Sequence, residues 1–202
     1  MVLGIEFRSA LRCVAERHGL EFIPGRFFSS PYAFGDIGKK HIRITKVRFG
    51  HGHHMEEYVR VAAEFPFALN SDLEVTKEGF LNKLIKYLGR RELEFDDREF
   101  DSEYFVRSNN PPEAKKLLNI RARHSLLSLS RADICFLVKN SEYSREIGAL
   151  WWASKRRHYT NPEKSEVICD IKGEIKDPHV LEDALELVLD VAGNVESAQS
   201  NN

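Results

Sequence analysis

Apolar residues recur near the start of the chain at the three- and four-residue spacing of an α-helix. The members of this stripe are Leu3, Phe7, Ala10, Leu11 and Val14. Gly19 follows them, and glycine is the residue that most often ends a helix in the left-handed conformation. The pattern therefore predicts an amphipathic N-terminal helix.

Two later segments alternate with a period of two instead. KKHIRITKVRF and EYVRVAAEF are rich in β-branched and aromatic residues, and the apolar positions of the second are Val59, Val61, Ala63 and Phe65. GHGHHM joins the two segments, and its glycines supply the positive φ angles that short hairpin loops need. We expect two antiparallel strands with the histidines at the hairpin tip.

Turn and capping residues divide the middle of the chain. A short strand is expected at Leu73–Val75, followed by a helix with Thr76 as its N-cap. An acidic loop then leads to a strand at residues 103–108. Asn110 and Pro111 have the spacing of an N-cap and a first helical residue, so a further helix is predicted to begin there.

The last part of the chain predicts strands and a terminal helix. DICFLVK, REIGALWWA and SEVICDI have strand composition. Asp177 and Pro178 then precede a wide apolar stripe of helical spacing. Most links between strands are too short for parallel crossovers. We therefore predict one α+β domain over residues 1–196, with a mainly antiparallel sheet covered by helices, amphipathic helices at both ends, and a disordered polar tail at 197–202.

The segment FDDREFDSEYFVRSNNPPEAKKLL, preceded by GDIGKKHIRIT, resembles a loosely defined group of uncharacterised prokaryotic proteins. The shared pattern is a Gly-x-x-Gly-Arg/Lys strand, then F-D-x-x-F-x-V-x-S-x-x-P, then a terminal helix. The likeness covers residues 18–192 and depends on Gly35, Gly38, Phe100, Asp101, Phe105, Val106, Ser108 and Pro111. The resemblance implies one continuous domain and carries no activity, since the group has none assigned.

Composition limits the classes of partner. The chain has 202 residues, with 30 Lys and Arg against 31 Asp and Glu, so its net charge of -1 provides no overall attraction to nucleic acid or to an anionic membrane. No uncharged apolar run has the length of a membrane span. The three cysteines lack CxxC spacing and are interpreted as buried apolar residues in a reducing compartment. We expect a cytoplasmic protein.

The histidines of the expected hairpin tip are a candidate metal site. His51, His53 and His54 could supply imidazole ligands to zinc or copper, with His41 or Glu56 completing the set. The segment has no cysteine and no evident group to orient the rings. A solvated turn and a patch that titrates near pH 6–7 are the alternatives, and no cofactor is expected.

Acidic residues between 96 and 103 lack the spacing of a calcium-binding loop. Among them Asp101 is flanked by phenylalanines, and we interpret its carboxylate as a hydrogen-bond acceptor in a turn.

Aromatic and basic residues mark a candidate binding edge. Its members are Phe27, Phe28, Trp151, Trp152, Lys155, Arg156 and Arg157. Aromatic faces beside cations are used by single-stranded nucleic acid binders, but three basic residues without a wider basic field do not predict nucleic acid as the partner.

Two hypotheses of function follow. The first is a non-catalytic binding or protein-interaction domain that uses this edge, with a partner protein or a second copy of the chain. The second is a small-molecule-binding or enzymatic cavity between the sheet and the C-terminal helix, with Asp101 or the histidine segment at its mouth. No motif of nucleophilic or phosphate-binding chemistry is present, and the sequence does not decide whether a reaction is catalysed.

Overall fold

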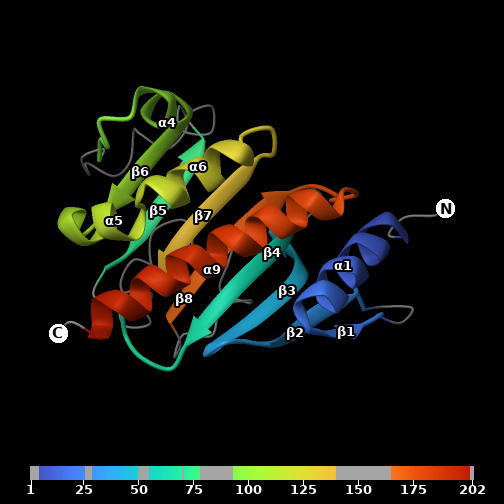
Figure 1. The fold of residues 1–202 in the computed structure, drawn as a ribbon. Coiled ribbons are helices and arrows are strands. Elements are labelled where there is room, and N and C mark those ends of the chain that lie inside the picture. The colour runs from blue at the N-terminus through green and yellow to red at the C-terminus, as the bar shows by residue number, and fades with distance from the viewer. Residues whose placement is uncertain are drawn as a thin grey trace.

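The computed structural model describes residues 5–25, 29–49, 55–69, 71–77, 93–139 and 165–200 (Figure 1). The described helices are α1 (Ile5–His18), α4 (Arg98–Glu103), α5 (Pro111–Leu117), α6 (Ile120–Ser128) and α9 (Pro178–Ser200). The described strands are β1 (Glu21–Ile23), β2 (Tyr32–Ile37), β3 (Lys40–Phe49), β4 (Glu56–Phe65), β5 (Leu73–Lys77), β6 (Tyr104–Ser108), β7 (Ile134–Lys139) and β8 (Ser165–Lys172).

The described strands form one sheet in the order β1-β2-β3-β4-β8-β7-β5-β6. Every pairing in it is antiparallel, which confirms the predicted α+β class with an antiparallel sheet. β8 comes last along the chain but lies between β4 and β7 near the middle of the sheet. The two halves of the sheet are therefore joined through the pairing of β4 with β8, whose paired residues are about a hundred positions apart in the sequence.

The described helices lie over one face of this sheet, and α9 crosses that face diagonally (Figure 1). α9 packs on β4 and β8, while α1 lies on one side of it and α5 and α6 on the other. The wide apolar stripe that predicted α9 fits this position, because a helix with neighbours below and on both sides buries most of its surface. None of the described helices has the length and apolar character needed to cross a membrane.

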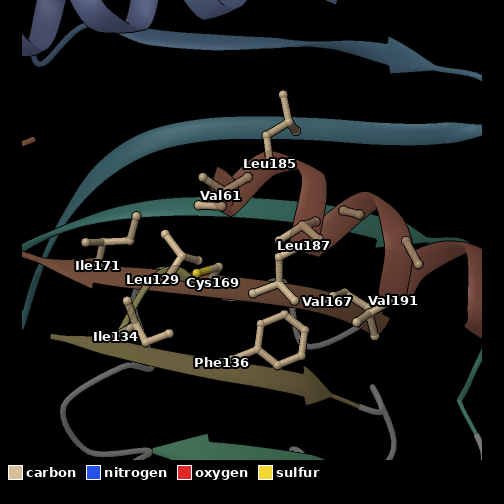
Figure 2. Packing of buried hydrophobic residues seen from close by; sticks show 14 of the residues in the cluster. Val61, Leu129, Ile134, Phe136, Val167, Cys169, Ile171, Leu185, Leu187 and Val191 are labelled. Carbon is tan, nitrogen blue, oxygen red and sulfur yellow. The ribbon is translucent and has the colours of Figure 1, made fainter. Parts of the chain in front are cut away.

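Apolar side chains fill the space between the sheet and α9. Figure 2 shows Val167 and Cys169 of β8 and Phe136 of β7 pointing toward α9, where Leu187 and Val191 meet them. All five side chains are fully buried. Burial of this kind stabilises a fold by about 25 cal/mol per Å² of apolar surface, so this layer is the main source of stability.

Two turns contain a glycine with a positive φ angle, and the one after α1 was predicted from the sequence. α1 ends at His18, and Gly19 adopts a φ of 68°. β2 and β3 pair up to Ile37 and Lys40, so Gly38 and Lys39 form a two-residue hairpin loop, with Gly38 at a φ of 64°. Glycine adopts this left-handed region without the steric cost that other residues incur.

Three boundaries in the middle of the chain differ from the sequence prediction. Thr76 is the fourth residue of β5 and not an N-cap, because it pairs with Cys135 and Phe105 on the neighbouring strands. The acidic loop contains a helix, α4, whose N-cap is Asp97. The helix that begins at Pro111 stops at Leu117, since the Asn119 side chain caps a second helix, α6.

The C-terminal helix is longer than predicted. α9 continues to Ser200, so residues 197–200 of the expected disordered tail are helical. Gln199 Nε2 donates to the carbonyl oxygen of Ala68 at 3.2 Å, and Val195 is buried one turn earlier. These contacts hold a polar segment that sequence alone assigns to disorder. The predicted helix after Thr76 and the predicted strand REIGALWWA lie outside the described residues.

Candidate functional site

The residues that the sequence indicated for binding and metal ligation lie outside the described part of the chain. They are Phe27, Phe28, His51, His53, His54, Trp151, Trp152, Lys155, Arg156 and Arg157. Their assigned roles therefore stay predictions, and the described residues that flank them supply the structural information.

The position of His41 on β3 excludes it as a ligand to a metal ion bound by the histidine segment. β3 and β4 remain paired as far as Phe49 and Glu56, which confirms that the two strands are antiparallel neighbours. His41 lies near the other end of β3, and eight strand steps of about 3.3 Å place it roughly 26 Å from Phe49. His51 follows Phe49 by two residues, which gives a reach of only about 7 Å. His41 therefore cannot share a metal ion with the histidine segment.

Glu56, the other proposed ligand, is engaged by neighbours. Its carboxylate accepts from Tyr58 Oη at 2.9 Å and lies 2.8 Å from Lys172 Nζ. The hydrogen bond from Lys172 to Glu56 raises the pKa of that lysine, so the ammonium is held charged. Within the described ranges, no three His, Cys, Asp or Glu side chains converge as a metal site.

The face of the sheet opposite α1 and α9, here called the second face, carries polar side chains in rows. Residues directly opposite each other on neighbouring strands share a face, so the register defines each row. The first row consists of Asp36, His41, Glu64, Glu166 and Lys139. The second consists of Glu21, Phe34, Arg43, Ala62, Ile168, Leu137, Glu74 and Arg107. The third consists of Ile23, Tyr32, Thr45, Arg60, Asp170, Cys135, Thr76 and Phe105.

A buried ion pair lies at the centre of the third row. Arg60 Nε donates to Asp170 Oδ1 at 2.8 Å, and a terminal nitrogen of the same guanidinium donates to Oδ2 at 2.9 Å. The side chains are 1% and 0% exposed. Burial lowers the pKa of Arg60, but the charge of Asp170, the hydrogen bonds to it and the nearby Glu166 together outweigh burial, so the pKa is raised overall. This two-pronged contact joins β4 to β8 and is suited to a structural role.

Two carboxylates face each other at the end of the same strands. Glu64 is directly opposite Glu166, and one terminal nitrogen of Arg43 lies 3.3 Å from an oxygen of each. Burial raises the pKa of Glu166, whereas the nearby cations Arg60, Lys139 and Arg43 lower it. Like charges directly opposite each other destabilise a sheet, so Arg43 is positioned where it relieves their repulsion.

The β2–β3 part of the second face presents aromatic rings to solvent. The rings of Tyr32 and Phe34 stack with centroids 5.9 Å apart and an angle of 25° between their planes. Tyr32 is 37% exposed, and Asp36 Oδ1 lies 2.9 Å from His41 Nδ1 in the adjacent row. We call this area the β2–β3 surface and define it as Tyr32, Phe34, Asp36, His41 and Arg43.

The acidic segment before β6 is a capped turn of helix. Asp101 accepts hydrogen bonds from the backbone nitrogens of Phe95, at 3.1 Å, and Asp97, at 3.2 Å. This confirms its predicted role as an acceptor in a turn. Asp97 accepts from Arg123 Nε at 3.0 Å, and that bond lowers the pKa of the Asp97 carboxyl. The carboxylates of this segment thus serve local structure.

The predicted cavity between the sheet and the C-terminal helix corresponds to a small hollow near the end of α9. Leu117, Val195 and Gln199 are among the residues that line it, and it has room for about one water molecule. The neighbouring space is filled by the apolar layer of Figure 2.

The residues that carry the resemblance described above have architectural roles. Phe100 and Val106 are buried in the core. Ser108 Oγ accepts from the backbone nitrogen of Asn110 at 3.0 Å and donates to the Asp72 carbonyl at 2.7 Å. Pro111 begins α5 after the Asn110 cap.

Comparison with known proteins shows a likeness of fold. No family model matches the chain, and no curated protein is similar to it in sequence. The crystal structure of the mycobacterial trehalose monomycolate transport factor A, TtfA, is similar, with a TM-score of 0.53 and 8% sequence identity over 94% of each chain. At this identity the likeness concerns the fold alone. Membership of the prokaryotic group stays a prediction.

Proposed function

We propose that this protein is a non-catalytic binding domain that contacts a partner protein through the β2–β3 surface. The observation that carries the proposal is the stacked pair of Tyr32 and Phe34, which lies half-exposed on a sheet face beside Arg43. Tyrosine and arginine are over-represented among the residues that contribute most to binding energy at protein interfaces.

Contacts within the chain restrain part of the β2–β3 surface before any partner binds. Tyr32 and Phe34 occupy alternate positions of one strand, and Arg43 is placed by Glu64 and Glu166 behind it. Side chains that are already ordered lose less conformational entropy on association, which favours affinity. In contrast, the hollow beside α9 has room for about one water, so the described residues favour a surface over a cavity.

The proposal includes the two phenylalanines of the binding edge predicted from sequence. Phe27 and Phe28 precede β2 by a few residues, so they are close along the chain to Tyr32. We propose that they extend the same contact area, that the partner is another protein or a second copy of this chain, and that the protein acts in the cytoplasm.

Site-specific photocrosslinking in cells of the source organism tests this proposal. A photoreactive phenylalanine analogue replaces Tyr32 in one strain and Phe67 in the other. Phe67 is a matched control because it is also 37% exposed and also packs on an aromatic neighbour, Phe65. We expect a discrete crosslinked product from position 32 and none from position 67. Sequencing of the product by mass spectrometry then identifies a second copy or another protein.

Sedimentation velocity provides the second measurement. If the partner is a second copy, Tyr32→Ser/Phe34→Ser should shift the protein toward monomer, whereas Phe67→Ser should not. Equal crosslinking at both positions, or none at position 32, would contradict the proposed surface.

A further inference from the structure

We propose that the segment recognised by the β2–β3 surface is basic, with lysine or arginine side chains that lie against the Tyr32–Phe34 pair. This inference rests on the proposed function and adds the chemical class of the partner. It is drawn from the distribution of charge over the second face.

Among the side chains that the structure describes, carboxylates outnumber cations in the rows around the aromatic pair. Across β1, β2, β3, β4 and β8, the three rows contain the acids Glu21, Asp36, Glu64, Glu166 and Asp170. The guanidiniums in the same rows are those of Arg43 and Arg60. His41 accompanies them and pairs with Asp36. The described side chains on this part of the second face therefore include more acids than bases, although the whole chain is close to neutral.

The two guanidiniums are already matched by carboxylates of the same chain. Arg60 is buried against Asp170, and Arg43 lies between Glu64 and Glu166. Asp36 is 73% exposed, and Glu21, beside Phe34, is exposed as well. The next cations along these rows, Lys139 and Arg107, lie toward the opposite edge of the sheet. A partner meeting this surface therefore encounters exposed acids around the exposed ring of Tyr32 and the partly buried ring of Phe34.

The chemistry of the rings agrees with the charge. The faces of tyrosine and phenylalanine attract lysine and arginine, and the attraction grows when water is excluded. The protein uses the same contact internally, since Arg12 lies 5.1 Å from the ring centroid of Phe22 and Lys46 lies 4.8 Å from that of Phe7. A basic segment would satisfy the carboxylates and the aromatic faces together.

Peptide display against the full chain tests the inference. A library of random peptides, each about a dozen residues long, is selected on the wild-type protein and, in parallel, on Tyr32→Ser/Phe34→Ser. Melting temperatures of both proteins are compared first, so that only a folded variant serves as the reference. We expect the peptides specific to the wild type to be enriched in lysine and arginine relative to the starting library.

The outcomes separate this inference from the proposed function. Wild-type-specific peptides that are neutral or acidic would overturn the inference and leave the binding surface intact. If the two selections yield the same peptides, both the surface and its proposed ligand are wrong.

Charge reversal then measures the effect on one enriched basic peptide. Asp36→Lys is expected to weaken its Kd about tenfold, and Asp36→Asn by a smaller factor, because each removes attraction at the rim of the contact. Glu16→Lys is the matched control, since Glu16 is exposed on α1 away from the second face, and should change Kd by less than about twofold. An equal effect of Asp36→Lys and Glu16→Lys would show only net-charge attraction and would refute site-specific recognition.

Discussion

Replacing Asp170 by alanine is expected to destabilise the protein by about 3–5 kcal/mol. The change removes the carboxylate that holds the guanidinium of Arg60 at 2.8 and 2.9 Å. Hydrogen bonds to charged groups contribute about 1.5–3 kcal/mol each, so two of them account for a loss of this size. Arg60 is 1% exposed, so water does not replace the lost partner.

A double-mutant cycle separates the ion pair from its surroundings. Arg60→Met alone is expected to cost a similar amount, because it leaves the Asp170 carboxylate buried without its cation. The double variant Arg60→Met/Asp170→Leu puts apolar groups on both strands and should recover to within about 1.5 kcal/mol of the wild type. The recovery measures the coupling between the two side chains.

Urea unfolding followed by circular dichroism gives the free energy of unfolding of all four proteins. The slope of each transition with denaturant is compared as well, because a changed slope indicates a changed unfolded state. A loss below about 1 kcal/mol for Asp170→Ala, or losses that simply add in the double variant, would refute the role assigned to this pair.

Three further predictions concern other parts of the fold. Burial raises the pKa of Glu166, so the folded protein binds more protons than the unfolded chain above the ordinary value of 4.5, and stability should fall as pH rises from 4.5 toward the raised pKa. Glu166→Gln should flatten that fall in urea titrations at several pH values, and the exposed Glu186→Gln should leave it unchanged. Asn110→Ala removes the side-chain acceptor of the Glu113 backbone nitrogen and should cost about 1 kcal/mol in the same assay, so an unchanged midpoint would contradict its role as a cap. Leu185→Ala opens a cavity beneath α9 and should cost about 2–5 kcal/mol, compared by thermal unfolding with Glu186→Ala, which should cost less than about 0.5 kcal/mol.

The N-cap of one helix was predicted from the sequence, and the N-caps of two others were missed because their surroundings in the sequence do not distinguish them. Asn110 and Pro111 determine the start of α5 through contacts within four residues, so sequence identified that boundary. Asp97 caps α4 in the same way, but it stands among other acids, any of which could have been a loop residue. Asn119 starts α6 two residues after α5 ends, and the continuous helical composition concealed the break.

The candidate site was predictable only in part. The alternation in β4 assigned Val59, Val61 and Ala63 to one face of a strand, which leaves Arg60 on the other, and the structure confirms that assignment. It did not indicate that Arg60 is buried, because burial depends on Asp170, which enters the sheet beside it from 110 residues away. The role of Asp101 in a turn, by contrast, depends on neighbours within six residues and was inferred correctly.

The sequence by itself determined the strands β3 to β8 and the amphipathic helices at both ends, because each follows from the periodicity or composition of one segment, and it determined the antiparallel class from the short links between strands. It did not predict β1 or β2. Tertiary structure alone decided that β8 lies between β4 and β7, and therefore which charges meet on the second face. Pairing between distant strands depends on the packing of the whole sheet against α9 and on the register of each neighbour, and neither is encoded in a local pattern. The aromatic rings of Tyr32 and Phe34 were present in the sequence, but their stacking beside a row of carboxylates exists only once that register is set.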